Sequence, residues 1–105
     1  MTPADRMAFL AAGFLIRDRM SPDMLARWRS EFHSEVAHRG GVVDERCYER
    51  AVANDVLREV VQRAGRHFRD EIVPRVRKHL TEDQVEALEI ELSDSLARTL
   101  AEIKD

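Results

Sequence analysis

Residues 73–88 read VPRVRKHLTEDQVEAL, and this stretch decides how the second half of the chain folds. Pro74 lacks the amide hydrogen that an α-helix needs, and its ring clashes with the preceding turn, so we expect a kink or break near residues 72–73. Thr81, with Gln84 three residues later, is typical of a capping box that starts a new helix. Because Thr81 follows the first helical segment at once, the sequence predicts that the new helix folds back against the end of the earlier one.

Both segments that meet at Thr81 carry apolar stripes at helical spacing. We expect the first segment to begin after Asp44, a good N-cap residue, and to run to Leu80 with Gly65 and Pro74 as interruptions. Its stripe consists of Tyr48, Val52, Leu57, Val60, Val61, Ala64, Phe68, Ile72, Val76 and Leu80. The stripe after Thr81 consists of Val85, Leu88, Leu92, Leu96, Leu100 and Ile103.

Two further helices are marked by local signals in residues 1–41. Thr2 followed by Pro3 is typical of an N-cap and a proline at the first helical position, and predicts a helix over about Pro3–Arg19. Ser21–Pro22 repeats the signal and starts a second helix, which we expect to end at Gly40–Gly41 in a left-handed cap. The apolar stripe of that second helix consists of Met24, Leu25, Trp28, Phe32 and Val36.

Residues 7–16, MAFLAAGFLI, form an uninterrupted apolar run. The run is far shorter than the roughly 20 residues of a membrane span, and the charged residues on both sides of it do not fit a signal peptide. Residues 13–25, GFLIRDRMSPDML, are similar to the strand-then-helix opening of phytanoyl-CoA-type dioxygenases, but no His-x-Asp iron motif follows. We therefore expect a helix of the mature protein, with residues 14–16 open to either a helix or a strand.

Length and composition favour one small all-α domain over residues 1–105. Charged residues make up 35% and apolar residues 44%, which suits a folded helical protein, and 4 Gly and 3 Pro are too few for a turn-rich β fold. The fold class expected is a compact bundle of four to five helices. A single cysteine, Cys47, cannot form an internal disulfide, which favours a reducing, cytoplasmic location.

Charge is distributed unevenly along the chain. Residues 1–43 have a net charge of +1, residues 44–80 of +2 and residues 81–105 of −6, which gives the overall −3. The basic side chains of the middle segment gather in its second half: Arg58, Arg63, Arg66, Arg69, Arg75, Arg77 and Lys78. Such a patch suits phosphate or an acidic partner. Because the acidic last helix folds back beside it, we expect most of this charge to be neutralised within the fold.

The histidines raise the question of a metal site. His67 and Glu71 are one helical turn apart and can reach one metal ion. HFRDEIVP at residues 67–74, with LTEDQVEAL at residues 80–88, resembles part of the hemerythrin-like (HHE) cation-binding family over about residues 67–92. The resemblance implies a four-helix bundle that holds two irons, with His67 and Glu71 among the ligands. Two ligands do not hold a di-iron centre, so our main expectation is no metal and no cofactor.

Other catalytic signals are weak. Cys47 falls in the first turn of the helix expected after Asp44, where the helix dipole would lower the pKa of its thiol, but no histidine is near it in sequence. The sequence has no glycine-rich phosphate loop, CxxC pair or nucleophile elbow. We therefore expect no enzyme.

Apolar residues spread around most of the circumference of the first helix, beyond the single stripe of a surface helix. We expect the excess to contact another copy of the chain or a partner protein. The candidate partner-binding residues are Phe9, Leu10, Phe14, Ile16, Arg66 and Arg69.

The sequence thus favours a small, non-catalytic helical protein that acts through protein–protein interaction, as an adaptor, an assembly subunit, or an inhibitor or regulator of a larger bacterial or phage machine. We expect a protein partner or a homodimer, with neither a membrane nor a nucleic-acid partner. The alternatives are a hemerythrin-like metal-binding bundle and a nucleic-acid-binding regulator that uses residues 58–78.

Overall fold

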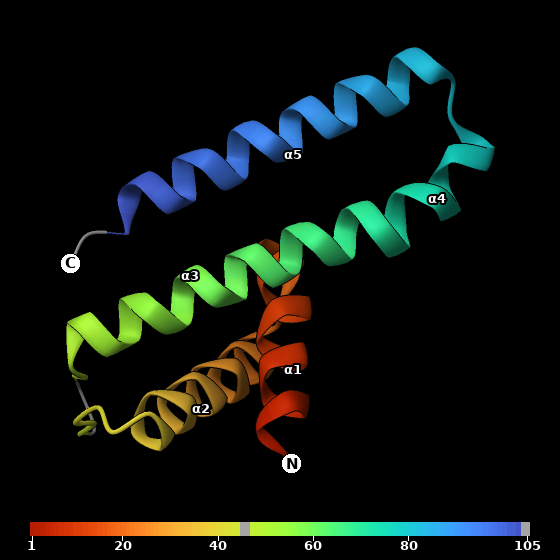
Figure 1. Cartoon of the computed structure of the whole chain (residues 1–105). Coiled ribbons are helices and arrows are strands. Elements are labelled where there is room, and N and C mark those ends of the chain that lie inside the picture. The colour runs from red at the N-terminus through yellow and green to blue at the C-terminus, as the bar shows by residue number, and fades with distance from the viewer. Residues whose placement is uncertain (45–46, 104–105) are drawn as a thin grey trace.

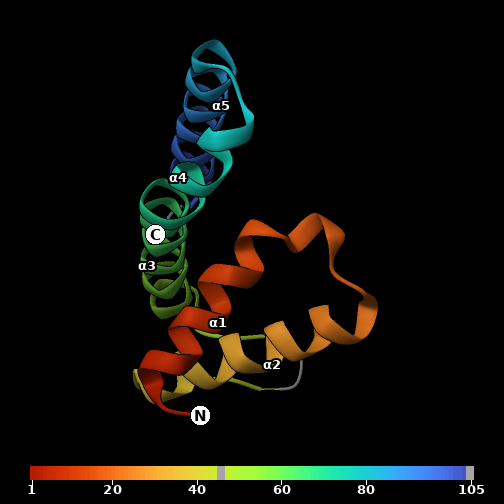
Figure 2. The ribbon, with the colours of Figure 1, turned by 90° about the vertical axis from the view of Figure 1, so that its right-hand side faces the viewer.

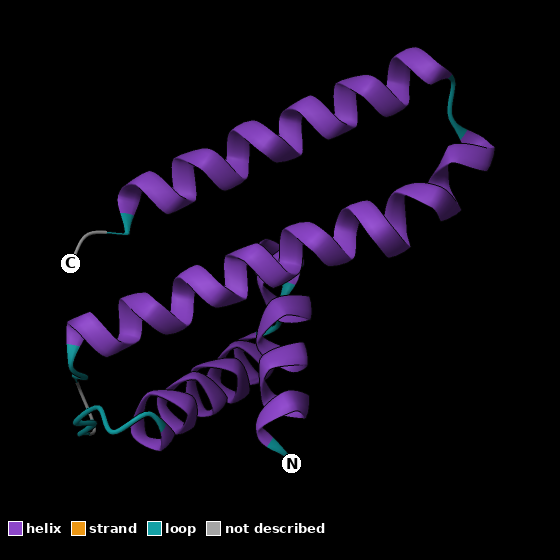
Figure 3. Ribbon diagram, viewed as in Figure 1, coloured by secondary structure: helices purple, strands orange, loops and turns teal. Residues whose placement is uncertain are grey.

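The computed structural model describes residues 1–44 and 47–103, and most of these are helical (Figure 1, Figure 3). The predicted all-α fold class is therefore confirmed. The α-helices are α1 (Pro3–Leu15), α2 (Pro22–His38), α3 (Arg50–His67), α4 (Val73–Val76) and α5 (Glu82–Glu102). Short turns of other helical types are η1 (Arg17–Arg19), η2 (Phe68–Ile72) and η3 (Arg77–His79).

The helix starts follow the local signals in three cases. Thr2, Ser21 and Thr81 each accept a hydrogen bond from a backbone amide of the first turn that follows, so the N-caps of α1, α2 and α5 are confirmed. The capping box predicted for Thr81 and Gln84 is present, and Thr2 forms a second one with Asp5. Each box satisfies backbone donors that the first turn would otherwise leave without partners.

The end of α1 differs from the prediction. The α-helix ends at Leu15, and the chain continues as the 3-10 turn η1 rather than as α-helix to Arg19. Ser21 precedes a proline and has an extended conformation, so no α-helix can continue through it into α2. Phe14 and Leu15 are helical and Ile16 is the C-cap residue, so this run is not a strand.

The start of α3 was predicted wrongly. Asp44 is not its N-cap, and the helix begins at Arg50 with Glu49 at the cap position. The Asp44 carboxylate instead accepts a hydrogen bond from the amide of Cys47 (2.7 Å), which lies outside the helix. The amide of Glu49 donates to the carbonyl of Val42 (2.8 Å), so backbone bonds across the loop delay the helix.

The core lies where α1, α2 and α3 meet. In Figure 1, α1 crosses the middle of α3 steeply, and α2 lies on the same side of α3. Trp28 of α2 is buried against α1, and its indole Nε1 donates to the carbonyl of Leu10 (2.9 Å). Close approach is possible because α1 carries glycine at Gly13, where a Cβ atom would lie 2.3 Å from Trp28 Cδ1. The core residues are Met7, Leu10, Trp28, Phe32, Val36, Ala53, Val56 and Val60.

The kink predicted before Pro74 is confirmed as a π-helical turn. Residues Phe68–Ile72 form η2, whose wider hydrogen bonding accommodates a proline that cannot donate to the helix. After η3 the chain reverses at Leu80, and α5 runs back beside α3 (Figure 1). The predicted hairpin is therefore confirmed.

The hairpin gives the molecule an elongated shape, with extents of 48 × 27 × 24 Å. Figure 2 shows α3 between α5 on one side and the pair α1 and α2 on the other. Of the residues of α5, Val85 and Leu96 are buried, so this helix rests on the body of the protein along one narrow edge. A membrane-spanning helix is not found among the described residues.

Candidate interaction surface

A groove runs between α3 and α5. Its lining residues are Val61, Gln62, Gly65, Arg66, Arg69, Ser93, Leu96, Ala97 and Leu100, and its volume is about 490 Å³. The floor is apolar because the buried residues Val61 and Leu96 line it, and the two helices approach closely at Gly65. A Cβ atom at Gly65 would lie 2.7 Å from Leu96 Cδ1, so the glycine sets how deeply α5 sits against α3.

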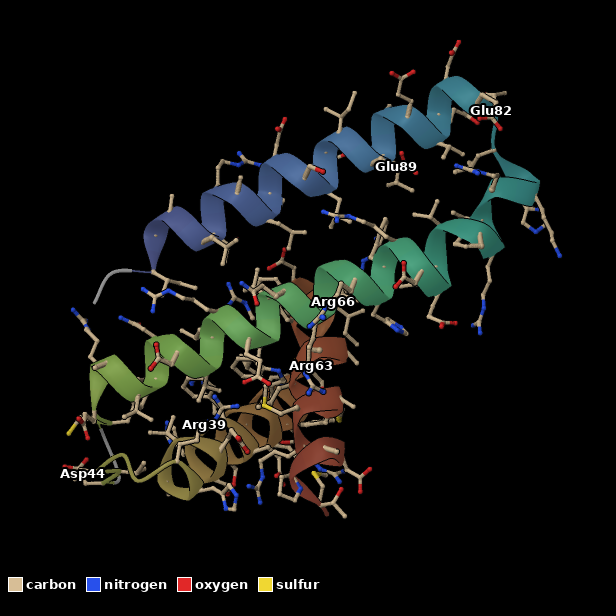
Figure 4. All side chains as sticks on the ribbon, in the orientation of Figure 1. Arg39, Asp44, Arg63, Arg66, Glu82 and Glu89 are labelled. Carbon is tan, nitrogen blue, oxygen red and sulfur yellow. The ribbon has the colours of Figure 1, made fainter. Side chains whose placement is uncertain are left out.

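Arg66 and Arg69, two of the predicted partner-binding residues, lie along this groove. Both are exposed, and among the described residues no carboxylate forms an ion pair with either of them. Arg66 also lines a second hollow, of about 610 Å³, between α3 and the alanines of α1, together with Arg63 and His67. Figure 4 shows Arg63 and Arg66 next to each other on α3 where α1 crosses it. The structure therefore brings these arginines together on one open surface.

The acidic α5 neutralises part of the basic segment. Arg77 and Glu89 form an ion pair across the hairpin, with Nη2 and Oε1 3.7 Å apart, and Figure 4 shows Glu89 on the side of α5 toward α4. Arg63 pairs instead with Glu59 of its own helix (3.6 Å). The exposed Arg77–Glu89 pair contributes little to stability. The predicted neutralisation is thus seen at Arg77 and not at Arg66 or Arg69.

The four apolar candidate residues in and directly after α1 have different environments. Leu10 is fully buried in the core and has no surface to offer a partner. Phe9 and Phe14 are half-buried, with the guanidinium groups of Arg27 and Arg17 over their rings at 5.5 and 5.6 Å. Ile16 is 53% exposed. Most of the apolar excess of α1 is therefore used against α2 and α3, since this helix is covered on two sides.

The histidines do not assemble a metal centre in the part of the chain described. His67 and Glu71 are both exposed, and residues 1–44 and 47–103 contain no group of three or more His, Cys, Asp or Glu side chains arranged to hold a metal ion. His33 lies beside the ring of Tyr48, with centroids 5.2 Å apart.

The pKa of the Cys47 thiol was predicted to be lowered, and the structure raises it instead. Cys47 lies in the loop before α3, so the dipole of that helix does not act on it as predicted. The Asp44 carboxylate accepts a hydrogen bond from the thiol (Sγ–Oδ2 3.0 Å), and this bond raises the pKa of Cys47 above its ordinary value. A raised pKa keeps the thiol protonated and poorly nucleophilic.

Part of the α5 side of the groove was not predicted from the sequence. Ser93 and Ala97 line the groove beside Leu96 and Leu100 of the predicted stripe. Ile90, which is 55% exposed, follows the same side of the helix at spacings of three and seven residues from Ser93 and Ala97. These small and apolar residues flank the main stripe and were available as a signal. They were overlooked because one stripe suffices for a helix that packs on one neighbour.

Comparisons with protein-family models, with curated proteins and with solved structures find no match to this chain. The resemblance of residues 67–92 to the HHE family therefore rests on its local pattern alone.

Proposed function

We propose that this chain is a small non-catalytic protein that acts by binding another polypeptide in the groove between α3 and α5. The observation that supports this proposal is the combination of an open apolar floor with two exposed arginines, Arg66 and Arg69, that lack carboxylate partners among the described residues. Interfaces commonly combine an apolar centre with arginine at its edge.

Blocking the groove tests the proposal. Ala97 is exposed and lines the groove, so Ala97→Arg places a charged side chain over the apolar floor without removing a core contact. Ala87→Arg is the matched control, because Ala87 is exposed on the same helix and does not line the groove. Both substitutions keep good helix formers, so helicity should not change.

The measurement is affinity capture with the tagged full-length chain in an extract of its native cells. We expect the parent and Ala87→Arg each to recover a polypeptide at a defined molar ratio to the tagged chain. Ala97→Arg should recover none of it. Equal recovery with all three forms contradicts the proposal. Recovery of nucleic acid, with binding that weakens steeply as salt increases, also contradicts it and favours a nucleic-acid-binding regulator.

A further inference from the structure

We propose that the partner in this groove is a second copy of the chain, so that two α3–α5 hairpins stack face to face as a four-helix bundle. This inference rests on the proposed function, because it names the partner of the same groove. Three observations carry it: the surface area of the isolated chain, the small-residue face of α5, and the opposite charges of the two helices.

The isolated chain exposes more surface than a protein of its size usually does. Its accessible surface is 7391 Å², about 1,400 Å² more than the roughly 6,000 Å² expected for a monomer of 12.1 kDa. Its radius of gyration is 15.1 Å, against about 13 Å for a globular chain of this length. A standard interface buries about 800 Å² on each partner, so the excess suffices for one such contact.

The groove side of α5 suits close packing between helices. Ile90, Ala97 and Ala101 follow one another at spacings of seven and four residues, and all three are exposed. Side chains at these spacings share a face, and alanine lets a facing helix approach closely. Ile90 supplies an apolar side chain that is 55% exposed. In a two-fold dimer the same contact is made twice, so this face of each copy can pack on the other copy.

Charge selects one way of stacking. Residues 50–79, from α3 to η3, carry eight basic and four acidic side chains, whereas residues 82–102 of α5 carry one basic and seven acidic ones. Stacking α3 on α3 would bring Arg66 and Arg69 of both copies together without compensation. Stacking α5 of each copy over α3 of the other places the acidic helix against those arginines. The two-fold arrangement with α5 over α3 is therefore the favoured one.

Sedimentation equilibrium of the full-length chain tests the association. We expect the parent to have twice the 12.1 kDa chain mass at about 100 µM. Ser95→Arg should have the same doubled mass, because Ser95 is exposed and, two residues before Ala97, lies on another face of α5. Ala97→Arg should sediment as a monomer, because a charge in the groove weakens association at least about 100-fold. Reversing both arginines, in Arg66→Glu with Arg69→Glu, should weaken association at low salt and less at high salt. Unchanged helicity in the circular dichroism of each variant shows that loss of the dimer is not loss of the fold.

Cross-linking tests the arrangement. Gln62→Cys and Ala97→Cys, each made in a Cys47→Ser background, place a thiol on either side of the groove. A mixture of the two variants should oxidise mainly to the mixed disulfide dimer, since α5 of one copy lies over α3 of the other. Disulfides that join two copies of the same variant, and do not join Gln62→Cys to Ala97→Cys, overturn this stacking.

The results separate this inference from the proposed function. A parent that stays monomeric at about 100 µM overturns the second copy as partner. If Ala97→Arg still abolishes capture of a different polypeptide, the groove retains its proposed function. If Ala97→Arg changes neither mass nor capture, both proposals are wrong.

Discussion

Glu35 is the charged side chain buried most deeply among the described residues, at 3% exposure. Its two carboxylate oxygens accept from Arg39 Nε at 2.9 Å and from Arg6 Nη1 at 3.4 Å. Arg39 also pairs with Glu59 of α3, so this one carboxylate links α1 and α2 to the helix that carries the groove. Removing one partner of a buried ion pair is strongly destabilising, because it leaves an uncompensated charge.

Replacing Glu35 should therefore destabilise the core. We expect Glu35→Gln to lower the free energy of unfolding by about 2 kcal/mol, because two arginines lose a buried charged acceptor. Urea denaturation monitored by circular dichroism measures this loss. Glu31→Gln is the control, since Glu31 pairs with Arg6 near the surface and should cost less than about 1 kcal/mol. Equal losses of unfolding free energy in the two variants would show that the burial of Glu35 does not increase its contribution to stability.

Gly13 is required by the shape of Trp28. An alanine Cβ would lie 2.3 Å from the indole Cδ1 and 2.7 Å from its Nε1, and the rigid buried ring cannot yield as a flexible chain end would. We expect Gly13→Ala to destabilise the protein by about 2–3 kcal/mol, despite the better helix propensity of alanine. In a Trp28→Phe background the same substitution should cost at least about 1 kcal/mol less, which a double-mutant cycle measures. Additive costs would rule out this contact as the cause.

The reactivity of Cys47 depends on Asp44. The hydrogen bond to the carboxylate raises the pKa of the thiol, so at a given pH less thiolate is present than in an unperturbed cysteine. We expect iodoacetamide to alkylate Cys47 more slowly than a free thiol near pH 8, and Asp44→Asn to shift the rate profile to lower pH and speed the reaction. An Asp44→Asn rate profile that coincides with that of the parent would contradict this assignment.

Among the helices, the starts and interruptions that depend on neighbouring residues could be predicted from the sequence. The caps at Thr2, Ser21 and Thr81 and the interruption before Pro74 depend on groups within one turn, so the sequence was sufficient to predict them. Asp44 also has a side chain that can cap a helix. The hydrogen bond from the Glu49 amide to the Val42 carbonyl holds the chain in a loop, so the helix begins only at Arg50. The α3–α5 groove depends on the depth at which Leu96 meets Gly65, a contact 31 residues apart that no local pattern specifies.

The exposed α5 leads to a prediction about local stability. Because Val85 and Leu96 are its buried residues, its amides should be less protected from hydrogen exchange than those of α3 in the monomer. Association covers the same helix, so its protection should increase with protein concentration in the parent and stay low in Ala97→Arg. Hydrogen exchange followed by mass spectrometry, at two concentrations, measures both. Protection of α5 that is the same at both concentrations in the parent would argue against a covered α5.

The molecule as a whole consists of a body and an arm that share α3. The body, formed by α1, α2 and the first part of α3, contains the core cluster and the buried Glu35. The arm, formed by α4, α5 and the rest of α3, provides much of the 48 Å length and contains α5, which has seven acidic side chains and one basic one. The hydrophobic driving force is therefore concentrated at one end, since apolar burial scales with the area removed from water.

The single tryptophan of the chain lies in the body, stacked on Phe32 with ring centroids 5.6 Å apart. Its fluorescence therefore reports on the body alone, whereas far-ultraviolet circular dichroism sums the helices of body and arm. On heating Ala97→Arg, the ellipticity should begin to fall before the emission shifts to the red, because the arm melts first. The two curves would then fail to superimpose, and a single melting temperature would not describe this small protein.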